Sequence, residues 1–481
     1  MSYVELHCHS NFSFQEGASY IHELLPRAVQ LGYPALALTD HDNLCGAMEF
    51  ARAARSLGIQ PIIGAEVTMQ AGHHLTLLAE TRQGYSNLCR LLSFARLTTD
   101  RREPELDPRL LSEHAEGLIL LTGCRRGEVP SLVQQGRLDQ AGEAAKQYVE
   151  WFGRDNVFME LQQNLVQGDM KQNRRLVALA RRLGVRIVAT NNVHYHVRER
   201  HQLHDCLVAV KNLKSLEESH RERHANSEFY LKSPEEMADL FYDYPEAIAN
   251  TLRITERCSA FDLTRDLDYT FPDSPVPEEF TQESYLRHLC EQAAVRRYES
   301  ITDKVKERLD EEFRLIRRHK LEGFFLIYHD IIQLGRDVMV DLGLTDRETP
   351  LEENPLGRGR GSSVAMLVGY LIGLSHIDPL EFNLSLERFL PDDDMASVPD
   401  IDLDFPRNIR EELIKRVHQK YGFERAALTG MISTYKLKSA VRDLGRILGL
   451  PPDEVDKLAK RADHSSAKSL SAEMASLPEF R

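Results

Sequence analysis

The feature that most constrains the fold is an alternation of short apolar runs with amphipathic segments over the first two hundred residues. The apolar runs are 3–9, 35–40, 61–69, 74–80, 117–123, 157–163 and 186–191, and the helical patterns between them are 21–32, 45–58, 85–97, 138–153 and 170–184. Strand–helix repetition is typical of a parallel sheet, and about seven units predict a closed barrel. We therefore predict an α/β multidomain protein that begins with a (β/α)7 barrel.

Side chains that can bind metal lie at or just beyond the C-terminal ends of these runs, where a (β/α) barrel keeps its active site. They are His7, His9, Asp40, His41, Glu66, Cys124, Asn192 and His194, whereas His74 starts its run and fits this placement less well. The mixture of imidazole, carboxylate and thiolate suits Zn²⁺, Mn²⁺ or Fe in a multinuclear site that activates water and clamps a phosphate. The alternative is a polar barrel mouth without metal.

A second motif, residues 399–405, places Asp400, Asp402 and Asp404 on alternate positions of a short apolar run. In a strand these three carboxylates share one face. Like charges this close repel one another and need cations, which predicts a two-metal phosphoryl-transfer site.

A glycine-rich stretch at 357–363 precedes the apolar segment 364–374, which we expect to be a helix. A glycine-rich turn that leads into a helix N-terminus can cradle phosphate with backbone N–H groups. Arg358 and Arg360 add positive charge suited to a triphosphate. The alternative is a plain flexible turn.

Composition narrows the class of protein further. At 481 residues, with 42% hydrophobic residues, the chain has room for about three domains. No run reaches the ~18 apolar residues of a membrane span, and seven cysteines without regular spacing favour a reducing cytoplasm over a disulfide framework. The net charge of −14 is unusual for a nucleic-acid binder, so we expect a local basic surface or one outside this chain, which we expect to be C-terminally truncated.

The predicted domain order follows from pattern changes along the chain. A helical connector without evident chemistry follows the barrel, and a segment with three prolines at 271–281 indicates a linker into a new domain. Amphipathic patterns at 303–319 and 323–337 predict helices. The expected domains are the barrel at 1–210, the connector at 211–270, a catalytic domain at 271–432 and a further helical domain that starts at 433–481.

The N-terminal motifs resemble those of the polymerase and histidinol phosphatase (PHP) domain. The matching segments are 7–19, 36–44, 64–67, 73–80, 121–124 and 189–196. By this resemblance the metal ligands are His7, His9, Glu16, His41, Glu66, His74, Cys124, the residue at 192 and His194. The family often has Asp at the position of Glu16 and usually has Asp at the position of Asn192, whose amide binds metal weakly. His73, His196, His201 and His204 are interpreted as surface residues or as partners of ligands.

Segments 226–237, 357–390, 396–414 and 432–462 resemble the DNA polymerase III alpha subunit family of C-family DNA polymerases, most closely its error-prone, damage-associated branch. The resemblance implies an incomplete palm at 271–432 and the start of a thumb at 433–481. It implies that Asp400 and Asp402 hold Mg²⁺ and that Gly361 and Ser362, with Arg360, bind the phosphates of the incoming nucleotide, to which Arg358 is expected to add charge. Lys438 and Arg442 are expected to approach the DNA backbone.

The resulting hypothesis is a template-directed, error-prone DNA polymerase that acts in DNA repair. Its expected partners are primer–template DNA and deoxynucleoside triphosphates, and a missing C-terminal region would bind a sliding clamp and repair accessory proteins, with no membrane contact. By itself this chain is expected to be inactive in synthesis. Two rivals stay open for this chain: a PHP phosphoesterase or 3′–5′ exonuclease only, and a non-catalytic PHP scaffold.

Overall fold

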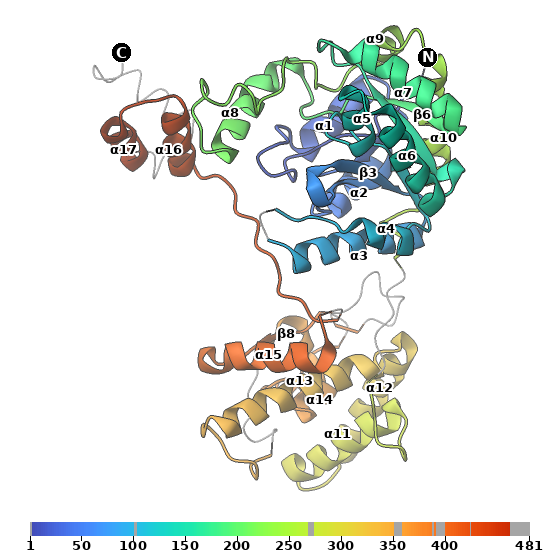
Figure 1. Cartoon of the computed structure of the whole chain (residues 1–481). Coiled ribbons are helices and arrows are strands. Elements are labelled where there is room, and N and C mark those ends of the chain that lie inside the picture. Colours follow the sequence, from blue (N-terminus) through green and yellow to red (C-terminus); the bar gives the residue numbers. More distant parts are fainter. Residues whose placement is uncertain are drawn as a thin grey trace. The chain divides into compact units, whose positions relative to one another are not determined.

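The structure is a computed structural model that describes residues 2–100, 103–267, 274–350, 358–386, 389–390, 400–423 and 425–461. The chain divides into two compact units. Unit 1 comprises Met1–Leu267 with Thr434–Arg481, and unit 2 comprises Asp268–Ser433. Figure 1 colours them from blue to green with the final red helices, and from yellow to orange.

Unit 1 is built on a six-stranded sheet whose strands follow one another in sequence order. The strands are β1 (Ala35–Leu38), β2 (Gln60–Thr68), β3 (His74–Ala79), β4 (Leu118–Leu121), β5 (Val157–Gln162) and β6 (Arg186–Thr190). Pairs β1–β2, β4–β5 and β5–β6 are parallel, as the strand–helix pattern predicts.

The direction of β3 differs from the all-parallel sheet that we predicted. It runs antiparallel to both β2 and β4. Only residues 69–73 separate β2 from β3, and a parallel connection needs a dozen or more residues. The short connection therefore reverses the chain, so the start of β3 lies at the sheet edge where the parallel strands end.

The N-terminal run closes the sheet into the predicted barrel. Ala37 N donates to Glu5 O on one side, and Val193 N donates to His7 O on the other, at 2.9 and 2.8 Å. His9 N also donates to Val193 O. The run thus has neighbours on both flanks, which removes the open edges of the sheet.

Helices surround this barrel, as predicted from the amphipathic segments (Figure 1). They are α1 (Ile21–Gln30), α2 (Ala47–Ser56), α3 (Arg82–Thr98), α4 (Pro108–Glu113), α5 (Glu128–Gln134), α6 (Leu138–Phe152), α7 (Asp169–Leu183), α8 (His201–Lys211), α9 (Pro234–Leu240) and α10 (Pro245–Cys258). Their apolar faces and the outward faces of the strands form one large buried cluster.

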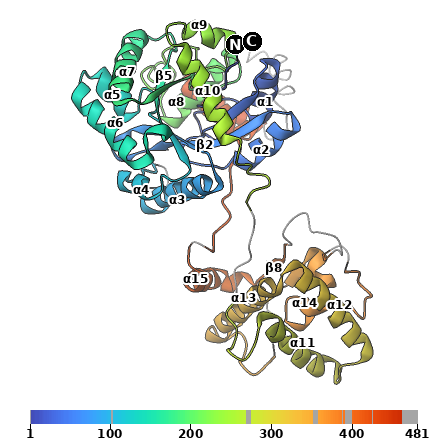
Figure 2. The same cartoon turned by 90° about the vertical axis from the view of Figure 1, so that its right-hand side faces the viewer.

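Helix α10 covers the N-terminal ends of the strands, opposite the edge that carries the candidate ligands (Figure 2). Its Ile254 and Cys258 are buried in a second cluster with Leu6, Ile119 and other inward-facing strand residues. Its side chains also bond to strand backbones, since Thr251 Oγ1 accepts from Val4 N. The helix that we expected in a separate connector therefore fills one end of the barrel.

Helices α16 (Leu437–Ile447) and α17 (Pro452–Arg461) also belong to unit 1. Ile447 is buried against Ala209 and Val210 of α8, and its carbonyl accepts from Leu216 N. The segment predicted as the start of a thumb thus packs on the last part of the predicted barrel segment.

Unit 2 is a helical body that carries a two-stranded antiparallel ladder. It comprises α11 (Gln282–Tyr298), α12 (Asp303–His319), α13 (Glu322–Asp341), β7 (Arg358–Arg360), the 3-10 turn η4 (Gly361–Ala365), α14 (Leu367–Leu371), β8 (Asp402–Asp404) and α15 (Arg410–Tyr421). Helices α12 and α13 confirm the predicted helices at 303–319 and 323–337. The helix expected over 364–374 was too long, because the chain forms η4 first and α14 has only five residues.

All seven cysteines are free thiols. Among the helices of the described ranges, none is both long and apolar enough to cross a membrane.

The position of α10 yields a stability prediction. Ile254→Ala should lower the free energy of unfolding of unit 1 by about 2–5 kcal/mol, because the cavity would lie inside the barrel. The single tryptophan, Trp151, lies on α6 and packs against the unit 1 core, so its fluorescence during urea unfolding reports on this unit. The control is Leu138→Ala, whose side chain is exposed and should change stability by less than about 0.5 kcal/mol. Equal effects of the two substitutions would contradict the role of α10.

Candidate functional site

The first two histidines point to the same side of the barrel mouth, as their spacing predicts. His7 Nδ1 donates to Glu160 Oε1 at 2.7 Å, and His9 Nδ1 donates to Ser13 Oγ at 3.0 Å. Each of these bonds leaves Nε2 as the atom directed into the site. A ring held through one nitrogen with the other nitrogen free is the usual arrangement of a metal-binding histidine. Glu160 is a partner that the sequence analysis missed.

The Glu66 carboxylate lies among four imidazoles. Its Oε1 is 3.3 Å from His7 Nε2 and 3.1 Å from His74 Nδ1. Its Oε2 is 3.4 Å from His41 Nδ1 and 3.8 Å from His9 Nε2. Two groups of possible ligand atoms therefore share this carboxylate: His7 with His9, and His41 with His74. A carboxylate with imidazoles at both oxygens can bridge two cations.

The hydrogen bonding fits a cation better than a closed polar network. His7 Nε2, Glu66 Oε1 and His74 Nε2 are buried and have no hydrogen-bond partner, although buried polar atoms are normally satisfied. His7 Nε2 and Glu66 Oε1 lie 3.3 Å apart inside the cluster, so both are available for coordination. The residues present thus fit a bound divalent transition metal.

Charge in this cluster is tightly coupled. Burial raises the pKa of Glu66, but His74 and His7 outweigh it and hold that pKa well below its usual range. Burial lowers the pKa of His7, but Glu160 and Glu66 outweigh it and raise the pKa to about 10. Burial lowers the pKa of His9 to about 3. A proton on His7 therefore occupies the place that a cation would take, because coordination requires neutral imidazole.

His74 joins the cluster because β3 is antiparallel. On a parallel strand its position at the start would place it at the opposite edge, which is why it fitted the predicted barrel poorly. The loop after β4 packs directly on it. A Cβ at Gly123 would lie 2.3 Å from His74 O, and Gly123 has a φ of +88°, so the loop needs glycine there.

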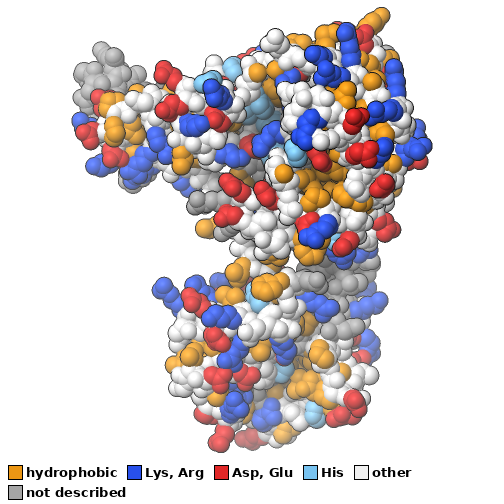
Figure 3. All heavy atoms as spheres, in the orientation of Figure 1, with side chains coloured by type: hydrophobic (Ala, Val, Ile, Leu, Met, Phe, Trp, Pro, Cys, Tyr) orange, Lys and Arg blue, Asp and Glu red, His pale blue; other side chains and the backbone are white. Residues whose placement is uncertain are grey.

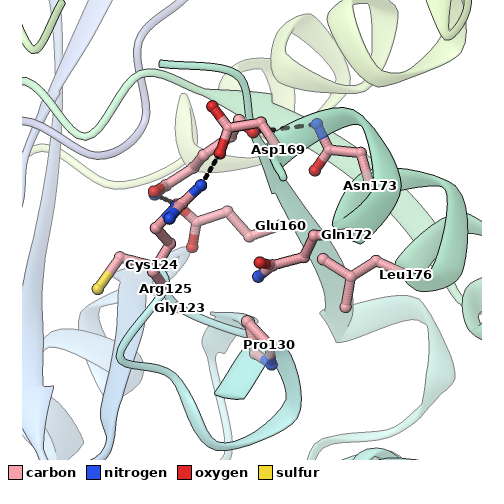
Figure 4. Close-up of a pocket in the computed structure, with 10 residues that line it drawn as sticks. Gly123, Cys124, Arg125, Pro130, Glu160, Asp169, Gln172, Asn173 and Leu176 are labelled. Carbon is pink, nitrogen blue, oxygen red and sulfur yellow. Dashed lines mark hydrogen bonds and ion pairs between the residues drawn. The ribbon is translucent and has the colours of Figure 1, made fainter. Parts of the chain in front are cut away.

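Cys124 follows this glycine and lies buried beside the cluster. Its Sγ is 3.9 Å from His74 Nδ1, and burial raises the pKa of its thiol well above the usual value. Figure 4 shows the adjoining cavity, where Arg125 pairs with Asp169 of α7. At about 10 Å³ this cavity has room for about one water molecule, and the ion pair of Arg125 with Asp169 holds the Cys124 loop against α7.

Glu16 reaches the cluster through His41. Its Oε2 lies 2.8 Å from His41 Nδ1, and its other oxygen pairs with Lys211 of α8. Burial raises the pKa of Glu16, but His41 and Lys211 hold it well below the usual value. His41 Nε2 also donates to Thr68 Oγ1, so both of its ring nitrogens are engaged. Glu16 and His41 would have to exchange these bonds to coordinate a cation.

Asn192 lies beside His9, with its Oδ1 3.2 Å from His9 Nε2. His194 is buried, with its ring centroid 4.4 Å from that of His9. Its other neighbours are His204 and His224. The sequence does not predict this group, because the three histidines lie in different segments and share no motif. Figure 3, in the orientation of Figure 1, shows several His side chains close together in the region between α8 and α1.

The aspartate run of unit 2 has the predicted alternation. Ile401 is buried, whereas Asp400, Asp402 and Asp404 are exposed. Leu403 packs against the core of unit 2. The three carboxylates therefore lie on the solvent side of β8, where cations can reach them.

The glycine-rich stretch pairs with this run. In the β7–β8 ladder Arg360 is opposite Asp402, and its Nε lies 3.0 Å from Asp404 Oδ2. Gly361 has a φ of +75°, which glycine adopts without strain. The side chains of Arg358 and Ser362 lie outside the described residues.

The N-terminus of α14 is not the phosphate cradle that we expected. The Glu312 carboxylate accepts from Leu367 N and Val368 N, each at 2.8 Å, and from Arg308. These amides are therefore already satisfied by a buried side chain. Any phosphate contact must come from the loop before them.

The two candidate DNA contacts lie on α16. Arg442 is exposed and its Nη2 is 3.2 Å from Asp456 Oδ1 of α17, and Lys438 is half-buried. Both stay predictions.

Two domain families match the chain. The PHP domain matches residues 5–164, and the bacterial DNA polymerase III alpha NTPase domain matches residues 284–481. An error-prone DNA polymerase of Symbiobacterium thermophilum is 39% identical over 100% of this chain and 44% of its own length. A DNA polymerase III subunit alpha of Treponema pallidum is 37% identical over 96% of this chain and 39% of its own length. The chain thus spans less than half the length of these relatives.

Among solved structures, a putative metal-dependent phosphoesterase of Bifidobacterium adolescentis is 15% identical, with a TM-score of 0.31. It covers 40% of this chain and 88% of its own.

The shared position of Glu66 generates a metal-binding prediction. Glu66→Gln should reduce the Zn²⁺ retained after dialysis by at least one ion per chain, measured by elemental analysis, because it removes the charge between the two groups of imidazoles. It should also reduce the stabilisation by Zn²⁺, which at 100 times Kd is about 2.7 kcal/mol for one site. The control is Glu143→Gln on exposed α6 surface. Unchanged Zn²⁺ content in Glu66→Gln would rule out this centre.

Proposed function

Because residues 284–481 match the bacterial DNA polymerase III alpha NTPase domain, and two relatives named as DNA polymerases are 39% and 37% identical to this chain, we propose that it serves template-directed, error-prone DNA synthesis in repair. The substrates would be primer–template DNA and deoxynucleoside triphosphates. In this reaction the primer 3′ oxygen attacks the α-phosphate of the nucleotide, and pyrophosphate leaves.

The observation that carries this proposal is the β7–β8 ladder. It joins two motifs about forty residues apart and puts Arg360 opposite Asp402. Cationic and anionic side chains thus meet on one small sheet, where a nucleotide's phosphates and their cations would both find partners. Asp400 and Asp402 would hold Mg²⁺, which when bound neutralises the leaving group and favours the attacking oxygen's ionised form.

The other residues have roles in positioning. Arg360 and Arg358 would bind phosphate oxygens, and Gly361 and Ser362 would let the nucleotide approach the backbone closely. Arg360 holds Asp404 in the present state, so nucleotide binding would exchange that ion pair for a phosphate contact. Lys438 and Arg442 are proposed contacts to the DNA backbone.

The test is primer extension by a polymerase that contains this chain. Asp400→Ala and Asp402→Ala should each reduce extension below detection, since each removes a proposed Mg²⁺ ligand. Both side chains are exposed, so the folded state should keep its stability. The matched control is Glu411→Ala, an exposed carboxylate at the start of α15. An active Asp402→Ala enzyme would overturn the assignment.

A second candidate function is phosphoester hydrolysis at the barrel mouth, with Zn²⁺ or Mn²⁺. The observation that favours it is Glu66 between two groups of imidazoles whose buried atoms lack partners. Proposed ligands are His7, His9, Glu16, His41, Glu66, His74, Cys124, Asn192 and His194. The metal would supply an activated water and a clamp for phosphate, as in a 3′–5′ exonuclease. A PHP domain that only braces the polymerase would bind metal without cleaving DNA.

Asn192 separates these two possibilities. Its amide oxygen faces His9, and Asn192→Asp would add a charged ligand at that point without changing the side-chain size. We expect Asn192→Asp to raise Mn²⁺-dependent release of nucleotides from a DNA 3′ end by about tenfold or more. Substitutions around a metal site typically change metal affinity or activity by about 10–100-fold. Asn87→Asp, also buried but on α3, is the control. No cleavage by either protein, with bound metal confirmed, would favour the scaffold.

We also propose a location in the cell and protein partners for this chain. The free cysteines are consistent with the proposed cytoplasmic location. A sliding clamp and repair accessory proteins stay predicted partners.

A further inference from the structure

Three histidines form a cluster beside the Glu66 centre. His194 follows β6, His204 lies on α8, and His224 lies in the segment after α8. Each offers one ring nitrogen, and these atoms lie within 4.8 Å of one another. The ring centroids of His224 are 4.5 Å from those of both His194 and His204.

The surroundings of the rings leave nitrogens available in the middle. His194 Nδ1 donates to Asn192 O at 2.9 Å, which leaves its Nε2 free. His204 Nδ1 faces Asp205 Oδ1 at 3.8 Å, and Arg223 holds that carboxylate in place. His224 Nδ1 is buried and has no hydrogen-bond partner. A buried donor or acceptor without a partner is costly unless something else binds it.

We propose that His194, His204 and His224 form a three-imidazole site for a transition-metal cation of the Zn²⁺ class. Three imidazoles and no carboxylate favour Zn²⁺ over Mn²⁺ and Mg²⁺, which prefer oxygen ligands. Tetrahedral Zn²⁺ with bonds of about 2.0–2.1 Å would draw the rings together and leave a fourth position. In zinc sites with three protein ligands, this fourth position takes water or another oxygen ligand.

The fold brings the three residues together through specific contacts. His194 N donates to Phe229 O, which ties the end of the segment that carries His224 to the chain after β6. Arg223 links the same segment to α8 through Asp205. The site thus depends on tertiary contacts among three separate segments. The three-imidazole site rests on the proposed function only because His194 is also a proposed ligand of the Glu66 centre. In the three-imidazole site, His194 would share a cation with His204 and His224.

The test is Zn²⁺ content and Co²⁺ spectra of the whole chain. His204→Gln and His224→Gln should each lose one Zn²⁺ per chain after dialysis and should weaken the visible bands of tetrahedral Co²⁺. His204→Cys should keep the Zn²⁺ ion and the Co²⁺ bands, because a thiolate is also a Zn²⁺ ligand. If His204 served only in packing, cysteine would not restore what glutamine removes. His220→Gln is the matched control, since His220 is exposed in the segment that carries His224. Trp151 fluorescence confirms that each variant is folded.

The outcomes separate this site from the Glu66 centre. Wild-type metal content in both Gln variants would overturn the proposal, and so would equal loss in His204→Cys and His204→Gln. If Glu66→Gln keeps its metal while His224→Gln loses one ion, the three-imidazole site stands and the Glu66 centre fails. The reverse result removes only the three-imidazole site. Dialysis against Mn²⁺ should leave the three-imidazole site empty, and a Mn²⁺ ion lost in His224→Gln would also contradict the proposal.

Discussion

The hydrogen bonds of the N-terminal run hold the whole barrel mouth in register. Residues 5–9 bond to β1 on one side and to Val193 on the other, so His7, His9 and the chain around residue 192 are placed by backbone contacts. Side-chain positions fixed by a closed sheet do not depend on loop conformations. The closed sheet therefore holds the buried charges of the centre at short range from one another.

Glu66 sets the electrostatics of that centre. Burying a carboxylate costs free energy unless a positive charge lies next to it. In this ring of imidazoles that positive charge is either a proton on a histidine or a bound cation. His7 and His9, two residues apart, have pKa values of about 10 and about 3 because one faces Glu160 and the other does not. The same residue type thus holds a proton at His7, which a bound cation would replace, and is neutral at His9.

The two units differ in the groups that surround their buried carboxylates. In unit 1 Glu66 is surrounded by possible cation ligands. In unit 2 Glu312 binds the amides at the start of α14 and Arg308, so its charge is used within the protein. The amides at the start of α14 are therefore satisfied, whereas the carboxylates of Asp400, Asp402 and Asp404 stay exposed.

Periodicity in the sequence determined the strands, most helices and the exposed face of Asp400, Asp402 and Asp404, because these features depend on local spacing. The motifs also identified most candidate ligands. Tertiary structure decided the direction of β3, and with it the position of His74, because a five-residue connection reverses the chain. It also decided that α10 fills the barrel, that Glu312 caps α14, and that His204 and His224 meet His194. These contacts join segments whose spacing carries no signal, since distance along the chain does not specify which surfaces pack together.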